Sequence, residues 1–104
     1  MKTITVVELK NLIEKGEEFQ LIDVRESYEH EFCNIGGELI PLGEVMNNLD
    51  RIDTSKKVII YCRTGVRSAT LISILDTMGY ENLYNLEGGI FAWSKEIDPS
   101  IPTY

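Results

Sequence analysis

Apolar residues fall along the chain in two alternating patterns. Short aliphatic runs such as 58–61 are typical of buried strands, whereas Val6, Leu9, Leu12 and Ile13 recur at helical spacing. Polar clusters and glycines separate these segments. We therefore predict strands over 19–24, 38–40, 58–61 and 83–86, and helices over 6–15, 27–32, 45–52, 68–78 and 89–97.

The ends of the predicted helices carry signals of their own. Thr5 and Glu8 have the spacing of a capping box, and Ser27 can cap the short helix that follows it. Gly16 and Gly79 supply the left-handed residue that commonly ends a helix. The boundaries therefore agree with the apolar pattern.

Strands and helices alternate along most of the sequence. This alternation indicates an α/β fold, in which helices cover both faces of a parallel sheet. In such sheets ligands bind beyond the carboxyl ends of the strands. The 104 residues suit one domain over 1–104, and we find no internal repeat or linker.

The composition excludes several classes of partner. Seventeen acidic side chains against 10 basic ones give a net charge of −7, which disfavours nucleic acid and anionic membranes. No segment approaches the roughly 20 apolar residues that cross a bilayer, so we expect a soluble, cytoplasmic protein. Two separated cysteines, Cys33 and Cys62, predict neither a disulfide framework nor a metal site.

The thiol of Cys62 lies at the junction between the apolar run 58–61 and the helical pattern that follows. N–H groups without partners at a helix start can converge on a group in such a loop, and the helix dipole adds positive charge. Arg63 and Arg67 contribute two cations. An inert buried thiol is the alternative, but this setting favours the thiolate, so we expect Cys62 to be a nucleophile.

Other polar residues have plainer interpretations. Cys33 has no cationic neighbour in the sequence and is expected to pack in the interior, with a resolving thiol as the alternative. His30 lies between two glutamates and is expected to be solvated. Asp23 and Arg25 lie at the end of the strand 19–24 and form either a local salt bridge or a support for the cysteine loop.

Three separated segments together resemble the single-domain rhodaneses: 21–26 (LIDVRE), 61–68 (YCRTGVRS) and 86–93 (LEGGIFAW). The resemblance covers nearly the whole chain. It implies a three-layer α/β/α domain around a central parallel five-stranded sheet. It also implies a sulfurtransferase that carries sulfur as a persulfide on Cys62, without a metal or another cofactor.

The resemblance assigns roles to particular residues. The predicted site comprises Cys62 as the nucleophile, Arg63, Thr64, Gly65, Val66 and Arg67 as the binding loop, and Asp23, Arg25 and Ser68 as supporting residues. The implied donor is thiosulfate or another carrier of sulfane sulfur, with Arg67 holding the sulfonate. The implied acceptor is cyanide, a small thiol or a protein thiol.

The chain departs from the family pattern before its third predicted strand. Many members have a His-Ile-Pro-Gly run there, whereas this chain has Asn34-Ile35-Gly36-Gly37, so no role of that histidine carries over. The Asn-Ile-Gly-Gly run resembles that of the rhodanese domains joined to adenylating enzymes that activate ubiquitin-like sulfur carriers.

Two other functions fit a cysteine in a strand-to-helix loop. In a sulfur-relay module, Cys62 would pass sulfur between proteins without turning over free thiosulfate. In a cysteine phosphatase or arsenate reductase, the loop would enclose an oxyanion. The phosphatase signature places five residues between cysteine and arginine, but only four separate Cys62 from Arg67, so the spacing favours sulfur transfer.

Overall fold

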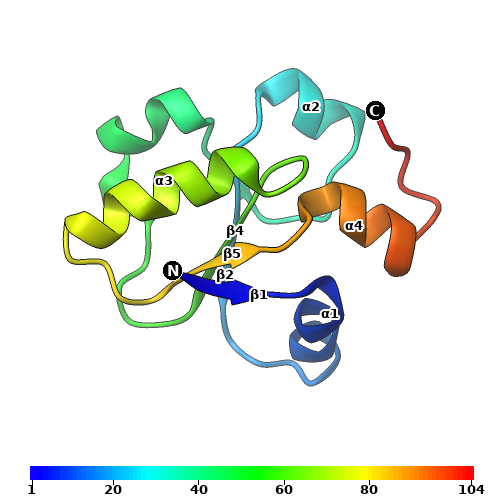
Figure 1. The fold of residues 1–104 in the computed structure, drawn as a ribbon, viewed down its shortest axis with the longest axis horizontal. Helices are drawn as coiled ribbons and strands as arrows, with labels where there is room; N and C mark the ends of the chain where they lie inside the picture. The colour runs from blue at the N-terminus through cyan, green and yellow to red at the C-terminus, as the bar shows by residue number, and fades with distance from the viewer.

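A single parallel sheet organises the protein, and the computed structural model describes all of residues 1–104 (Figure 1). Its strands are β1 (Lys2–Ile4), β2 (Gln20–Asp23), β3 (Glu38–Leu39), β4 (Val58–Tyr61) and β5 (Leu83–Leu86). They lie side by side in the order β1-β5-β4-β2-β3. The expected five-stranded parallel sheet is therefore confirmed, and β4 occupies its centre.

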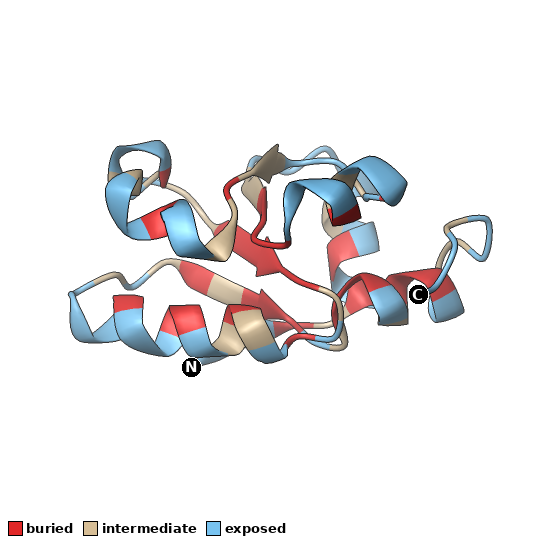
Figure 2. Cartoon of the chain, turned by 90° about the horizontal axis from the view of Figure 1, so that it is seen from above, coloured by how far each residue is buried: buried red, intermediate tan, exposed pale blue.

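Helices cover both faces of the sheet. They are α1 (Val6–Glu14), α2 (Ser27–Phe32), α3 (Val66–Thr77) and α4 (Gly89–Glu96), with the 3₁₀ helices η1 (Leu42–Asn47) and η2 (Leu49–Arg51). Alternate residues of β4 face opposite layers, because side chains alternate along a strand. Val58 and Ile60 pack with α3 and η1, whereas Ile59 and Tyr61 pack with α1 and α4. Figure 2 shows the resulting buried layer between helices with exposed outer faces.

Four local expectations need correction. The strand β1 was not predicted, because its three residues at the sheet edge show no clear alternation. Two 3₁₀ helices replace the helix expected over 45–52, since the backbone of Asn48 leaves the helical region between them. Helix α3 begins at Val66, two residues before the expected start. Glu26, not Ser27, is the N-cap of α2.

The sheet brings three loops together at the carboxyl ends of its strands. Asp23 at the end of β2 pairs with Tyr61 at the end of β4, and Ile60 pairs with Asn85 in β5. The predicted site residues therefore gather at one edge, as expected for ligands of a parallel sheet. The end of the chain lies beside α2 at this edge (Figure 1). No helix is both long enough and apolar enough to cross a lipid bilayer.

The core of α3 can be tested with two isoleucines on the same helix. Ile72 is 0% exposed and Ile74 is 47% exposed. We expect Ile72→Ala to lower the free energy of unfolding by about 2–5 kcal/mol, because it removes buried methyl groups and leaves a cavity. Ile74→Ala should change it by less than about 0.5 kcal/mol. Urea denaturation measures the free energy of unfolding of both variants. Equal losses of stability would contradict the burial of Ile72 on α3.

Candidate active site

The loop between β4 and α3 encloses the sulfur of Cys62. The N–H of Gly65 donates to Cys62 Sγ at 3.1 Å, and the N–H of Ser68 lies 3.5 Å from the same atom. Gly65 is the N-cap of α3 and has a φ of 98°, a conformation that glycine adopts without steric cost. The residue Cys62 is 1% exposed. The thiol therefore lies inside the loop, with backbone dipoles directed at it.

Other N–H groups of this loop remain free. Those of Arg63, Thr64, Val66 and Arg67 donate no hydrogen bond within the protein. Most backbone donors in folded proteins are paired, so four free donors among the five residues 63–67 are unusual. Two of them are the unpaired first N–H groups of α3. Together with the N–H of Gly65, these donors lie in the segment 63–67, for which a binding loop was predicted.

Helix α4 holds the outer side of the loop. The N–H groups of Ile90 and Phe91 donate to the carbonyl oxygens of Cys62 at 3.0 Å and Arg63 at 2.9 Å. Since C=O and N–H point in opposite directions in a trans peptide, the next two N–H groups of the loop point away from α4. A Cβ at Gly89 would lie 2.4 Å from the carbonyl oxygen of Cys62. Gly89 therefore permits the helix to approach the loop.

A buried side chain from β5 braces the loop from within. Asn85 Nδ2 donates to the carbonyl oxygen of Gly65 at 3.1 Å, which turns Oδ1 toward Ser68. The Ser68 hydroxyl donates to that Oδ1 at 2.5 Å and lies 3.3 Å from Cys62 Sγ. Ser68 thus contacts the sulfur directly. The sequence did not predict a role for Asn85, because no motif around it in β5 indicates a contact with the cysteine loop.

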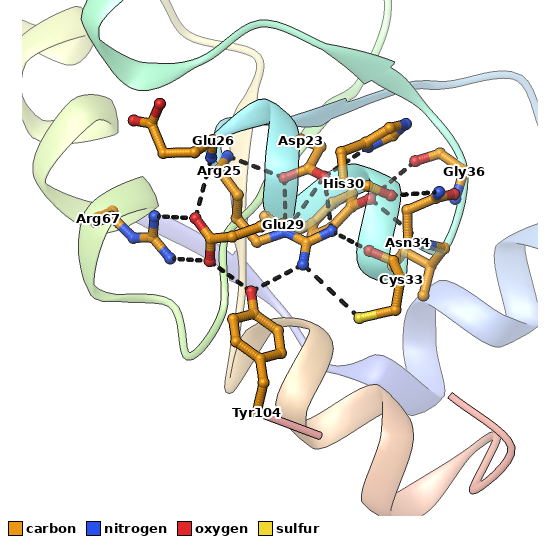
Figure 3. Close-up of polar contacts among 12 residues, drawn as sticks. Asp23, Arg25, Glu26, Glu29, His30, Cys33, Asn34, Gly36, Arg67 and Tyr104 are labelled. Atoms are coloured by element: carbon orange, nitrogen blue, oxygen red, sulfur yellow. Dashed lines mark hydrogen bonds and ion pairs between the residues drawn. The ribbon is translucent and has the colours of Figure 1, made fainter. Parts of the chain in front are cut away.

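Arg67 extends from α3 to a carboxylate on α2. Its Nη1 and Nη2 donate to Oε1 and Oε2 of Glu29 at 2.8 and 2.9 Å (Figure 3). The Tyr104 hydroxyl also donates to Glu29 Oε2, at 2.6 Å. The hydrogen bonds from Arg67, and then that from Tyr104, lower the pKa of Glu29 to about 2 against the effect of burial. Glu29 and Tyr104 were not predicted, since neither is near the loop in the sequence.

Asp23 and Arg25 form a fully buried ion pair. Arg25 Nη2 donates to Asp23 Oδ2 at 2.8 Å, and Arg25 Nη1 donates to the Tyr104 hydroxyl at 2.8 Å. Burial opposes the charge of Arg25, but the bonds to Asp23 and Tyr104 raise its pKa above the ordinary value. The side chains of the pair make no hydrogen bond or ion pair with the cysteine loop. It reaches Arg67 only through Tyr104 and Glu29.

Two interpretations of this region were wrong in part. His30 is not simply solvated, because its Nδ1 lies 2.8 Å from Asp23 Oδ2 (Figure 3). Cys33 is buried as expected, but it does have a cationic neighbour, since Arg25 Nη1 lies 3.9 Å from its Sγ. No group of three His, Cys, Asp or Glu side chains is placed to hold a metal ion.

Arg63 lies between two aromatic rings. Its guanidinium carbon is 5.1 Å from the ring centre of Tyr104 and 5.8 Å from that of Phe91. Its Nε is buried without a hydrogen-bond partner, and Arg63 makes no salt bridge. The guanidinium of Arg63 is therefore the one in the predicted loop that no carboxylate neutralises.

Comparisons with known proteins identify the family of this chain. The model of the Rhodanese-like domain family matches residues 5–96. "Probable adenylyltransferase/sulfurtransferase MoeZ" of Mycobacterium tuberculosis is 34% identical over 98% of this chain and 27% of its own length. "Putative sulfurtransferase YtwF" of Bacillus subtilis is 34% identical over 95% of this chain and 96% of its own length.

A solved structure shows the same fold. The rhodanese-like domain protein of Staphylococcus aureus superimposes with a TM-score of 0.83 at 32% identity, covering 100% of this chain and 99% of that one. The chain belongs to the rhodanese-like domain family. It spans only 27% to 38% of the length of relatives such as MoeZ and the chloroplastic Rhodanese-like/PpiC domain-containing protein 12 of Arabidopsis thaliana.

Gly89 provides a test of how α4 holds the loop. We expect Gly89→Ala to slow the alkylation of Cys62 by iodoacetamide. The new methyl group would displace the carbonyl groups of Cys62 and Arg63, and the loop N–H groups would then no longer stabilise the thiolate. Gly79→Ala is the matched control, since Gly79 also has a positive φ but has nothing within 4 Å of the added Cβ. Peptide mass spectrometry measures alkylation at Cys62. Equal rates in both variants would show that the loop does not depend on α4.

Proposed function

We propose that the protein moves a sulfane sulfur through a persulfide on Cys62. The donor is thiosulfate or a persulfide, and the acceptor is a thiol or cyanide. The position of Cys62 Sγ carries this proposal, because the sulfur lies at the end of the central strand and accepts the N–H of Gly65 at 3.1 Å. A second sulfur on Sγ would extend toward further N–H groups of the same loop.

The first half-reaction is a displacement at sulfur. The Cys62 thiolate attacks the outer sulfur of thiosulfate, an S–S bond to Cys62 forms, the S–S bond of the donor breaks, and sulfite leaves with the bonding pair. The product is a persulfide anion on Cys62. An acceptor thiolate or cyanide then attacks the outer sulfur and releases the Cys62 thiolate, which gives ping-pong kinetics.

The loop would stabilise the persulfide anion through hydrogen bonds. Charged acceptors form stronger hydrogen bonds than neutral ones, and successive backbone N–H groups make a concave anion site. Arg63 would supply positive charge at its rim, since Glu29 neutralises Arg67. Ser68 would orient Sγ, while Asp23 and Arg25 would fix the neighbouring segment through Tyr104.

A sulfur-relay module is the second candidate. Cys62 is nearly buried, and the two terminal nitrogens of Arg67 already bind Glu29. A partner protein that presents its sulfur directly to Cys62 would therefore suit the site. A phosphatase is less favoured, because Glu29 neutralises Arg67 and only four residues separate Cys62 from Arg67. Steady-state transfer from thiosulfate to cyanide separates an enzyme from a relay.

Intact-mass spectrometry after incubation with a sulfane-sulfur donor tests the proposal. We expect the wild type to gain one sulfur atom that a reductant removes, because the loop stabilises a persulfide on Cys62. Cys33→Ser should gain the same mass and Cys62→Ser should gain none. Sulfur loading that persists in Cys62→Ser would refute the assignment.

A further inference from the structure

Glu29 has all of its acceptor positions filled by the protein. Oε1 accepts from Arg67 Nη1 at 2.8 Å and from the N–H of Glu26 at 3.0 Å. Oε2 accepts from Arg67 Nη2 at 2.9 Å and from the Tyr104 hydroxyl at 2.6 Å (Figure 3). A carboxylate has about four lone-pair positions, and all are used here. Glu29 is 5% exposed and is ionised at neutral pH, since its pKa is about 2.

Arg67 is therefore neutralised before any donor arrives. It ends the predicted binding loop, and its forked pair of terminal nitrogens is the group suited to a sulfonate. Glu29 holds both of those nitrogens in a bidentate geometry. Among nearby cations, Arg25 is likewise paired with Asp23. Only Arg63 offers a guanidinium that no carboxylate faces.

This pairing opposes the binding of a dianion. Thiosulfate carries two negative charges toward a site that already holds Glu29 and the Cys62 thiolate. To bind the N–H groups of Arg67 that Glu29 leaves free, it would have to approach an ionised carboxylate that already cancels the charge of the guanidinium. A persulfide donor carries at most one negative charge on its sulfur atoms and needs no sulfonate clamp.

We infer that Glu29 selects the sulfur donor: by neutralising the charge of Arg67, it favours monoanionic or neutral persulfides over free thiosulfate. This inference rests on the proposed function of Cys62. With a hydropersulfide R–S–SH, the Cys62 thiolate attacks the outer sulfur, the new S–S bond forms, and R–S⁻ leaves with the pair from the broken S–S bond. The proton stays on the transferred sulfur, so no other reactant is required.

The test compares two donors with Glu29→Gln. The donors are thiosulfate and the hydropersulfide of 2-mercaptoethanol, which has no sulfonate. Glu29→Gln should raise kcat/KM for thiosulfate by about tenfold or more, mainly through a lower KM, because the charge opposing the dianion is removed and Arg67 is freed. In the same variant, kcat/KM for the hydropersulfide should change by less than about threefold.

Two further variants complete the design. Glu31→Gln is the matched control, since Glu31 is an exposed residue of the same helix that makes no ion pair, and it should alter neither donor. Tyr104→Phe removes one hydrogen bond to Glu29 and should shift the donor ratio in the same direction by a smaller factor. If thermal denaturation shows that Glu29→Gln is unfolded, Tyr104→Phe decides the question.

The outcomes separate the inference from the proposed function. If the wild type takes sulfur from neither donor, the proposed function fails and the inference falls with it. If the wild type loads Cys62 but Glu29→Gln and Tyr104→Phe leave the donor ratio unchanged, only the inference is overturned. An equal change for both donors also overturns it, because that result would indicate a general structural role for Glu29.

Discussion

The contact between α4 and the cysteine loop is the constraint on which the site depends. Ile90 and Phe91 bind the carbonyl oxygens of Cys62 and Arg63 through their backbone N–H groups. Because a carbonyl and the following N–H point in opposite directions, fixing these carbonyls fixes the dipoles of the loop. Gly89 allows the close approach. A glycine far along the sequence from Cys62 thus sets the electrostatics around the thiol.

The positive character of the site arises from backbone more than from side chains. The chain is acidic overall, and Glu29 and Asp23 neutralise Arg67 and Arg25. The N–H groups at the start of α3 have no such counter-charges. Hydrogen bonds to a sulfur anion act at short range, whereas long-range attraction of a dianion needs unpaired cations. The arrangement therefore suits holding a persulfide better than recruiting a free, highly charged donor.

The sequence predicted the features that local patterns encode. The apolar run of β4, the glycine of the loop and the helix after it placed Cys62 correctly at the end of the central strand. Asn85, Glu29 and Tyr104 had no such signal. Asn85 and Glu29 bind loop residues that are 20 and 38 positions away in the sequence, and Tyr104 binds Glu29 from 75 positions away. The same limit applies to His30, whose acidic neighbours in the sequence concealed its contact with Asp23.

A crystal structure of the protein after incubation with a persulfide donor tests the central claim most directly. The account predicts an additional sulfur bonded to Cys62 Sγ, within hydrogen-bonding distance of N–H groups in the loop 63–67, with α4 still bound to the loop carbonyls. An additional sulfur on Cys33, or a modified Cys62 whose loop N–H groups point away from the new atom, would contradict it.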